Sequence, residues 1–158
     1  MDNFHIGMAQ LLALKGPGII RSTGLGSCIG IILFDPFSQT GGMAHAMLPR
    51  HRHGRNDNKA KYVDTAIKML LEEMEAKGAK RENIIAKLAG GAQMFSDGGR
   101  SSLLEIGRRN SAAAEEELKE LGIPIMAKDV GGTCGRTLEL DCRDGTLYIK
   151  TLNQETRI

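Results

Sequence analysis

The architecture expected of this chain starts from the apolar run Ile29-Gly30-Ile31-Ile32-Leu33-Phe34, the turn Asp35-Pro36-Phe37-Ser38 and the run Gly42-Met43-Ala44-His45-Ala46-Met47-Leu48. Short apolar runs bounded by turn residues are typical of buried strands, and Asp-Pro marks a turn. The segment therefore predicts an antiparallel hairpin of buried strands.

The hairpin pattern places a cysteine near a histidine. If Asp35–Ser38 form the loop, Phe34 faces Gln39 and Cys28 lies opposite His45 on the same face of the sheet. Directly opposed Cβ atoms are ~4.5–5.5 Å apart, within range for a nucleophile and its base. A slip of one residue would turn His45 to the other face, so this hypothesis depends on the register.

Glycine and hydroxyl residues precede the first strand, in Arg21-Ser22-Thr23-Gly24-Leu25-Gly26-Ser27-Cys28. The glycine spacing is G-x-G-x-x-x-G, and a strand-like run follows it instead of a helix, which excludes a phosphate-binding turn. We expect a glycine loop that delivers Cys28 to the start of a buried strand, where backbone N–H groups can form an anion-binding nest.

The remaining pattern predicts an α+β fold of mixed sheet layers with two main helices packed outside, a layered sandwich. One helix carries Val63, Ile67, Leu70, Leu71 and Met74, with Asp57 or Asn58 as N-cap and Gly78 beyond its end. A second helix has Asn110 or Ser111 as N-cap and ends at Gly122. Further strands are expected at Met8–Leu14, Ile84–Leu88, Ile125–Ala127, Thr137–Leu140 and Thr146–Leu152, the last two joined at Asp144-Gly145.

Length and composition narrow the class of protein. The 158 residues predict one domain, 1–158. A net charge of +2, no tryptophan and six Phe and Tyr disfavour nucleic acid as a partner. No apolar run reaches the ~18 residues that span a bilayer, and the start lacks a signal-peptide pattern, so we expect a cytoplasmic protein without membrane insertion.

The candidate residues each have a structural alternative. Cys28 and His45 could both be ordinary core residues, and Cys134 and Cys142 are expected to serve packing. His51 and His53 have no third ligand at a defined spacing, so no metal site is predicted. The basic stretch Arg50–Arg55 is either a solvated loop or a docking surface for an acidic partner.

Six segments in order along the chain resemble the chemoreceptor glutamine deamidases of the CheD family. They are Gly24-Leu25-Gly26-Ser27-Cys28, Ala44-His45-Ala46-Met47-Leu48-Pro49, Lys61-Tyr62-Val63-Asp64-Thr65-Ala66, Ala89-Gly90-Gly91-Ala92-Gln93-Met94-Phe95, Ile106-Gly107-Arg108-Arg109-Asn110, and Asp129-Val130-Gly131-Gly132 followed by Gly135-Arg136-Thr137. Each segment alone is weakly specific, but six in family order make a chance match very improbable.

The resemblance implies a cysteine hydrolase that converts glutamine side chains of chemoreceptor cytoplasmic helices to glutamate. It implies Cys28 as nucleophile and His45 as base, with Ser22 standing where the family has a catalytic threonine. The hypothesis adds oxyanion donors in the Gly26–Cys28 turn, including Gly26 and Ser27, and no cofactor.

The same resemblance suggests where substrate and partners bind. The loops Gly90-Gly91 and Gly131-Gly132 are expected at the rim of the site, with Gln93 or Thr137 nearby, and Thr23, Gln93, Arg50 and Arg52 are candidates for substrate contact. The implied partners are the cytoplasmic domain of a chemoreceptor and a CheC-like phosphatase. Two alternatives stay open: a non-catalytic module that binds receptor or CheC, and a thiol protein for redox or acyl-transfer chemistry.

Overall fold

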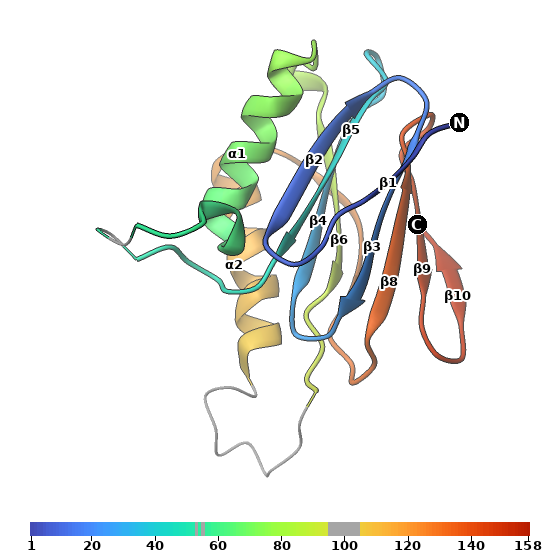
Figure 1. Cartoon of the computed structure of the whole chain (residues 1–158). Coiled ribbons are helices and arrows are strands. Elements are labelled where there is room, and N and C mark those ends of the chain that lie inside the picture. Colours follow the sequence, from blue (N-terminus) through green and yellow to red (C-terminus); the bar gives the residue numbers. More distant parts are fainter. Residues whose placement is uncertain (53, 55, 95–104) are drawn as a thin grey trace.

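The computed structural model describes residues 1–52, 54, 56–94 and 105–158, which form two stacked sheets with helices on one side (Figure 1). The strands are β1 (Asn3–His5), β2 (Gln10–Lys15), β3 (Ile19–Leu25), β4 (Ile29–Asp35), β5 (Thr40–Ala46), β6 (Ile85–Gly90), β7 (Ile125–Val130), β8 (Arg136–Asp141), β9 (Thr146–Lys150) and β10 (Glu155–Arg157). The helices are α1 (Val63–Ala76) and α2 (Ile106–Glu120), and η1 (Lys59–Lys61) and η2 (Arg81–Asn83) are short 3₁₀ turns.

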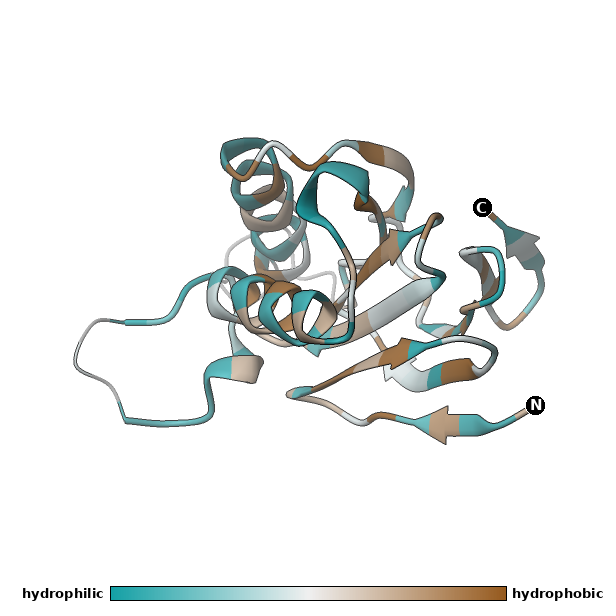
Figure 2. Cartoon of the chain, turned by 90° about the horizontal axis from the view of Figure 1, so that it is seen from above, coloured by the Kyte–Doolittle hydropathy of each residue, from teal (hydrophilic) through white to brown (hydrophobic). Residues whose placement is uncertain are grey.

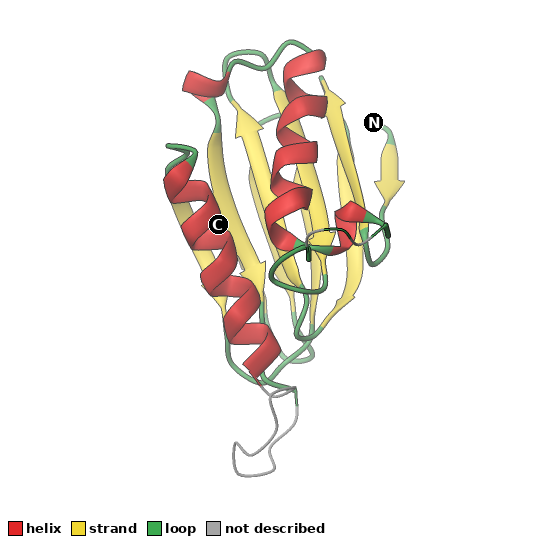
Figure 3. Cartoon of the chain, turned by 90° about the vertical axis from the view of Figure 1, so that its left-hand side faces the viewer, coloured by secondary structure: helices red, strands yellow, loops and turns green. Residues whose placement is uncertain are grey.

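The strands pair into two mixed sheets. The inner sheet has the order β2-β5-β4-β6-β7 and the outer sheet the order β1-β3-β8-β9-β10. The pairs β6–β7 and β1–β3 are parallel and the others antiparallel. Figure 3, viewed from the helix side, shows α1 and α2 lying across the inner sheet. The predicted α+β class, with two helices outside mixed sheets, is confirmed.

Strands β4 and β5 are buried at every residue, because both faces of the inner sheet are covered. On one face Ile31 and Leu33 pack with Leu70 of α1. On the other face Ile32 packs with Leu138 of the outer sheet. In Figure 2 the hydrophobic colour lies mainly between these layers and the hydrophilic colour on the outward sides of the helices. The side chains of β4 and β5 that point between the sheets are therefore cut off from water.

The predicted β4–β5 hairpin forms, but its register differs by two residues from the expected one. Asp35 pairs with Thr40 and Gly30 pairs with His45, so the loop is 36–39 instead of Asp35–Ser38. Cys28 is consequently not opposite His45. Because side chains alternate with a period of two, a shift of two keeps both residues on the same face, as diagonal neighbours.

Asp35 explains the different register. Its side chain is buried, and its carboxylate accepts the backbone N–H groups of Phe37 at 2.9 Å, Ser38 at 3.2 Å and Lys80 at 2.9 Å. An aspartate that caps the turn in this way belongs to the end of the strand, and the chain turns after it. Gln39 completes the turn with φ +52°.

The segment expected as a glycine loop before Cys28 is largely strand β3. Ser22 pairs with Leu138 of β8, and the register is irregular between Ser22 and Leu25. The loop prediction was wrong there because polar and glycine residues hide the strand pattern, whose inward positions include Ile20 and Ser22. The three-residue strands β1 and β10 were also not predicted.

The connections differ in detail from the sequence predictions. Asn58 caps η1 and not α1, since its side chain accepts the N–H of Ala60 at 3.0 Å. Helix α2 begins at Ile106, so Asn110 lies inside it and is not its N-cap. The β8–β9 link covers four residues, because Asp141 pairs with Thr146. The predicted stops are confirmed, with φ +104° at Gly78 and +72° at Gly122.

Close packing of the two sheets requires glycine at position 30. A Cβ there would lie 2.3 Å from Leu138 Cδ1 and 3.3 Å from the Ala89 carbonyl oxygen. We expect Gly30→Ala to lower the free energy of unfolding by about 1–3 kcal/mol, the usual effect of overpacking a core. Urea unfolding measures this, with Gly135→Ala as control because its Cβ would meet only the Leu25 carbonyl oxygen at 3.7 Å. Equal stability of the two variants would contradict this account of the sheet packing.

Candidate active site

Three segments bring Cys28, His45 and Ser22 together between the two sheets. Cys28 follows the turn from β3 into β4, His45 lies on β5 of the inner sheet, and Ser22 lies on β3 of the outer sheet. Ser22 and His45 are fully buried and Cys28 is 7% exposed. Cys28 is therefore the residue of this group that solvent can reach.

The contacts of Ser22 determine which nitrogen of His45 carries the proton. Ser22 Oγ lies 2.8 Å from the Ile6 carbonyl oxygen and 2.7 Å from His45 Nδ1. A hydroxyl has one hydrogen, and a carbonyl oxygen can only accept, so Ser22 donates to Ile6 and accepts from Nδ1–H. The lone pair of the imidazole is then on Nε2. Within the described residues this buried nitrogen has no hydrogen-bond partner.

Burial keeps both reactive groups neutral near pH 7. Burial, together with the charge of His5, lowers the pKa of His45 to about 4. Burial also raises the pKa of the Cys28 thiol, an effect that the backbone N–H of Cys28 partly opposes. The resting pair is therefore a thiol beside a neutral imidazole. Nε2 is a free acceptor for the thiol proton once an electrophile is in place.

Hydrogen bonds to the carbonyl oxygens of Gly26, Ser27 and Cys28 hold the turn that carries Cys28. The Gly26 oxygen accepts from Ala92 N–H at 2.9 Å, the Cys28 oxygen from Gly91 N–H at 2.7 Å, and the Ser27 oxygen from Asn110 Nδ2 at 2.9 Å. In a trans peptide the C=O and N–H bonds point in opposite directions. The N–H groups of Ser27 and Cys28 therefore point away from these partners.

Neither of those two N–H groups has an acceptor elsewhere in the part of the chain that the structure describes. N–H groups in this position can stabilise negative charge next to the thiol. Gly26 contributes differently: its Cα lies under Met94, whose Cγ would be 2.9 Å from a Cβ at this position.

The glycine loops expected at the rim contact one another and the Cys28 turn. Gly131 N–H donates to the Gly90 carbonyl at 2.9 Å, and Gln93 N–H donates to the Gly132 carbonyl at 2.8 Å. The structure thus brings Gln93 to this rim. Thr137 does not lie there, because Leu138 faces the inner sheet and Thr137 lines a hollow on the opposite face with Glu139 and Tyr148.

Two residues of this region were not predicted as functional. Arg136 is 8% exposed and donates to the carbonyl oxygens of Gly90 at 3.1 Å and Gly131 at 3.0 Å, with Asp129 as its ion-pair partner. Asn110 holds the Ser27 carbonyl from α2. Both residues lie in segments that resemble the CheD family, Asn110 in Ile106–Asn110 and Arg136 in Gly135-Arg136-Thr137, but no local sequence pattern indicates the contacts that they make.

The other substrate-contact candidates lie away from the thiol. Thr23 is exposed on the opposite face of β3 from Ser22, with Oγ1 3.4 Å from His5 Nε2. Arg50 and Arg52 line a surface hollow beside α2 with Arg109 and Glu116, and Arg50 is hydrogen-bonded to Glu116. His53 and Arg55 of the basic stretch, and Phe95 of one family-like segment, lie outside the described residues.

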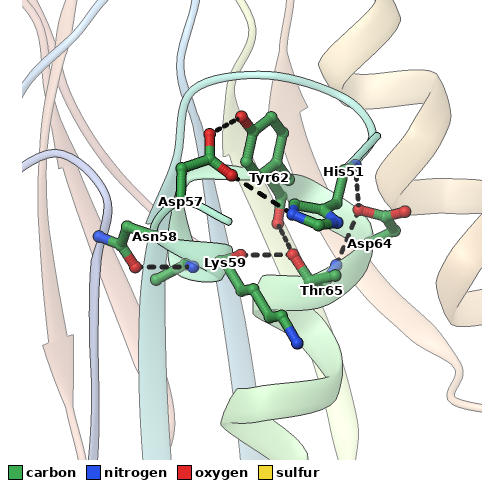
Figure 4. Close-up of polar contacts among 8 residues, drawn as sticks. His51, Asp57, Asn58, Lys59, Tyr62, Asp64 and Thr65 are labelled. Atoms are coloured by element: carbon green, nitrogen blue, oxygen red, sulfur yellow. Dashed lines mark hydrogen bonds and ion pairs between the residues drawn. The ribbon is translucent and has the colours of Figure 1, made fainter. Parts of the chain in front are cut away.

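His51 takes part in a polar cluster next to this hollow (Figure 4). Its Nε2 lies 3.3 Å from Asp57 Oδ1, its backbone N–H donates to Asp64 at 2.9 Å, and its ring meets Tyr62 edge-on at 5.0 Å. Among the described residues, no three His, Cys, Asp or Glu side chains are grouped as metal ligands. His51 thus helps to hold the segment between β5 and α1.

The remaining cysteines differ from each other. Cys142 is buried among the side chains between the sheets, and burial and Asp141 raise its pKa to about 12, so its packing role is confirmed. Cys134 is exposed, and its predicted packing role was wrong. It lies in the β7–β8 loop just after Gly131 and Gly132, which take positive φ and direct the chain along the surface.

No helix in the described residues combines the length and apolarity needed to cross a bilayer.

The chain is similar to several known proteins. Among solved structures, the Bacillus licheniformis hypothetical protein YfiH has a TM-score of 0.48 and 12% identity, over 76% of this chain and 49% of its own. The probable chemoreceptor glutamine deamidase CheD of Caldanaerobacter subterraneus subsp. tengcongensis is 49% identical over 94% of this chain and 92% of its own. The chemoreceptor glutamine deamidase CheD of Halalkalibacterium halodurans is 47% identical over 97% of this chain and 96% of its own. The family model "CheD chemotactic sensory transduction" matches residues 47–151, and the chain belongs to the CheD family.

Proposed function

We propose that this protein deamidates glutamine side chains of chemoreceptors, with Cys28 as nucleophile, His45 as general base and Ser22 as the group that orients His45. The activity is supported by the names of relatives at 43–49% identity over nearly the whole chain. The residue roles are supported by one observation above all. The Ser22–His45 hydrogen bond fixes the proton on Nδ1 and leaves Nε2 as the basic nitrogen.

The first half of the reaction makes a thioester. His45 Nε2 takes the proton of the Cys28 thiol as the sulfur attacks the carboxamide carbon of the substrate glutamine. The electron pair of the C=O bond moves to oxygen, which accepts the N–H groups of Ser27 and Cys28. The imidazolium then gives its proton to the amide nitrogen, the C–N bond breaks and ammonia leaves.

The second half repeats these roles with water. Neutral His45 takes a proton from a water molecule, whose oxygen attacks the thioester carbon. Collapse of the oxyanion breaks the C–S bond, and the proton returns from His45 to the Cys28 sulfur. The products are glutamate and the resting thiol–imidazole pair, so the cycle needs no cofactor.

Ser22 suits a base that must be neutral when it rests. A carboxylate beside Nδ1 would favour the imidazolium and raise the pKa of His45. A hydroxyl that donates its own hydrogen bond to the Ile6 carbonyl oxygen accepts the hydrogen bond from Nδ1–H without adding charge. A threonine offers the same hydroxyl, which is why Ser22 can occupy the position of the family threonine.

The hollow with Arg50 and Arg52 is the surface that we assign to substrate docking. Both side chains are exposed and basic, and they suit an acidic helix of a receptor's cytoplasmic part. Such a substrate would place the protein in the cytoplasm. A CheC-like phosphatase could occupy the same face, and Gln93 at the rim would then meet either partner.

The nucleophile is tested by mass spectrometry of a receptor cytoplasmic fragment incubated with enzyme. We expect the wild type to produce the Gln-to-Glu mass change and Cys28→Ala to produce none, because alanine at this position cannot form the thioester. Removal of a general base lowers the rate roughly 10²–10⁴-fold, and the deamidation rate of Ser22→Ala should fall by less than this. Ser22→Thr should retain most of the activity. Cys134→Ala is the matched thiol control. Receptor binding without a mass change would favour the non-catalytic module, and deamidation by Cys28→Ala would refute the mechanism.

The buried base predicts an unusual pH dependence. Because the pKa of His45 falls from 6.5 to about 4 on folding, the unfolded chain binds more protons between these values. The His45 contribution to stability is therefore complete above pH 6.5 and is lost as the pH falls toward 4. An NMR titration should place the His45 midpoint near 4, and the acid limb of kcat/KM should follow it. A midpoint near 6.5 would contradict the neutral resting pair.

Charge reversal tests the docking surface. Arg52→Glu should raise KM about fivefold with kcat unchanged, since an exposed ion pair is worth up to ~1 kcal/mol, and high salt should reduce the difference. Arg157→Glu makes the same charge change on β10 and should leave KM near the wild-type value. If both variants behave alike, the effect is one of net charge and the docking assignment fails.

A further inference from the structure

Asn110 is a buried side chain for which the proposed mechanism has no role so far. It lies in α2, its side chain is fully buried, and its Nδ2 donates to the carbonyl oxygens of Ser27 at 2.9 Å and Met47 at 3.0 Å. Ser27 precedes the nucleophile, and Met47 follows the strand that carries the base. One amide group thus ties the start of β4 to the end of β5.

The bond to Ser27 controls the direction of the Cys28 N–H. The carbonyl of Ser27 and the N–H of Cys28 belong to one planar trans peptide, so fixing one bond fixes the other in the opposite direction. This N–H is close enough to the Cys28 sulfur to lower the pKa of the thiol against the effect of burial. Asn110 therefore acts on a group next to the reacting sulfur without touching the sulfur itself.

The energetics of Asn110 also point to a role beyond packing. Its Oδ1 is buried and has no partner among the described residues. An unsatisfied buried polar atom destabilises the folded state, a penalty that an apolar side chain would not carry. The benefit of the amide must then come from its two donated hydrogen bonds.

The backbone of α2 supports the same turn by a second route. A Cβ on Gly107 would lie 2.4 Å from the Ala92 carbonyl oxygen and 2.6 Å from the Gly91 carbonyl oxygen, so the helix touches this segment backbone to backbone. The N–H groups of Gly91 and Ala92 hold the carbonyl oxygens of Cys28 and Gly26. Helix α2 thus reaches every carbonyl of the turn, directly through Asn110 and indirectly through Gly91 and Ala92.

We propose that Asn110 is a positioning residue of the cysteine site, which orients the Cys28 N–H toward the oxyanion and fixes the turn relative to the strand of His45. The expected effect of Asn110 on kcat rests on the proposed deamidase function. Its effect on the Cys28 thiol is separate, because thiol reactivity can be measured without a receptor substrate.

The test compares Asn110→Ala with Ser111→Ala. Ser111 is the next residue of α2, and within the described residues its hydroxyl donates a hydrogen bond to the Gly107 carbonyl of the same helix at 3.2 Å. We expect Asn110→Ala to lower kcat toward the roughly 10²-fold loss caused by removal of one oxyanion donor, with KM nearly unchanged. Alkylation of Cys28 by iodoacetamide, followed against pH, should show its apparent pKa displaced upward. Ser111→Ala should keep wild-type values in both measurements.

Asn110→Asp makes the test independent of the volume lost in the alanine variant. Its carboxyl group fills the same space and, when protonated, donates one hydrogen bond in place of two. We expect kcat between those of Asn110→Ala and the wild type, lower above the pKa of the new carboxyl than below it. If circular dichroism shows that Asn110→Ala does not fold, the pH-dependent change of kcat in Asn110→Asp tests the positioning role instead.

Wild-type kcat and an unshifted alkylation profile in a folded Asn110→Ala would overturn the inference, as would an equal loss in Ser111→Ala. A wild-type enzyme that alkylates normally but never deamidates a receptor fragment would overturn the proposed function alone. The alkylation profile of Asn110→Ala would still decide the positioning role in that case.

Discussion

The hydrogen bonds of Asp35 fix the register on which the site depends. Burial by itself raises the pKa of Asp35, but the N–H groups of Lys80, Ser38 and Phe37 outweigh it and leave the pKa below its usual range. The aspartate therefore stays ionised and keeps the turn after β4 in place. A slip of one residue in β4–β5 would turn His45 from the space between the sheets toward the helices, away from Ser22.

That space between the sheets explains why the proposed catalytic group is uncharged. A buried ionised pair costs several kcal/mol unless it is fully hydrogen-bonded. Ser22, His45 and Cys28 avoid this cost with neutral groups and one directed chain of hydrogen bonds from the imidazole through the hydroxyl to the Ile6 carbonyl. In the proposed reaction, charge forms only transiently, next to the N–H groups of the Cys28 turn.

The sequence predicted the parts of this fold with strong periodicity. The β4–β5 hairpin, the apolar stripe of α1 and the glycine stops of both helices follow from local pattern. The prediction that Cys28 and His45 share one face of the sheet holds although the register differs by two residues, because side chains alternate with a period of two. Ser22 was not placed in a strand, since the pairing with β8 that makes β3 a strand is not visible in β3 itself. Asn110 looked like an N-cap because asparagine is common there, and only the approach of α2 to the Cys28 turn shows its contact with Ser27.

Backbone contacts, more than side chains, give this site its rigidity. The Cys28 turn is held by Gly91 and Ala92, these are pressed by Gly107 of α2, and the adjoining Gly90 and Gly131 carbonyls are held by Arg136 of the outer sheet. Each contact joins a different layer to the same turn. The proposed nucleophile is therefore positioned by helix α2 and by both sheets at once. In the proposed reaction, binding energy from a receptor substrate is then available to orient the glutamine side chain, because the enzyme groups need little rearrangement to meet it.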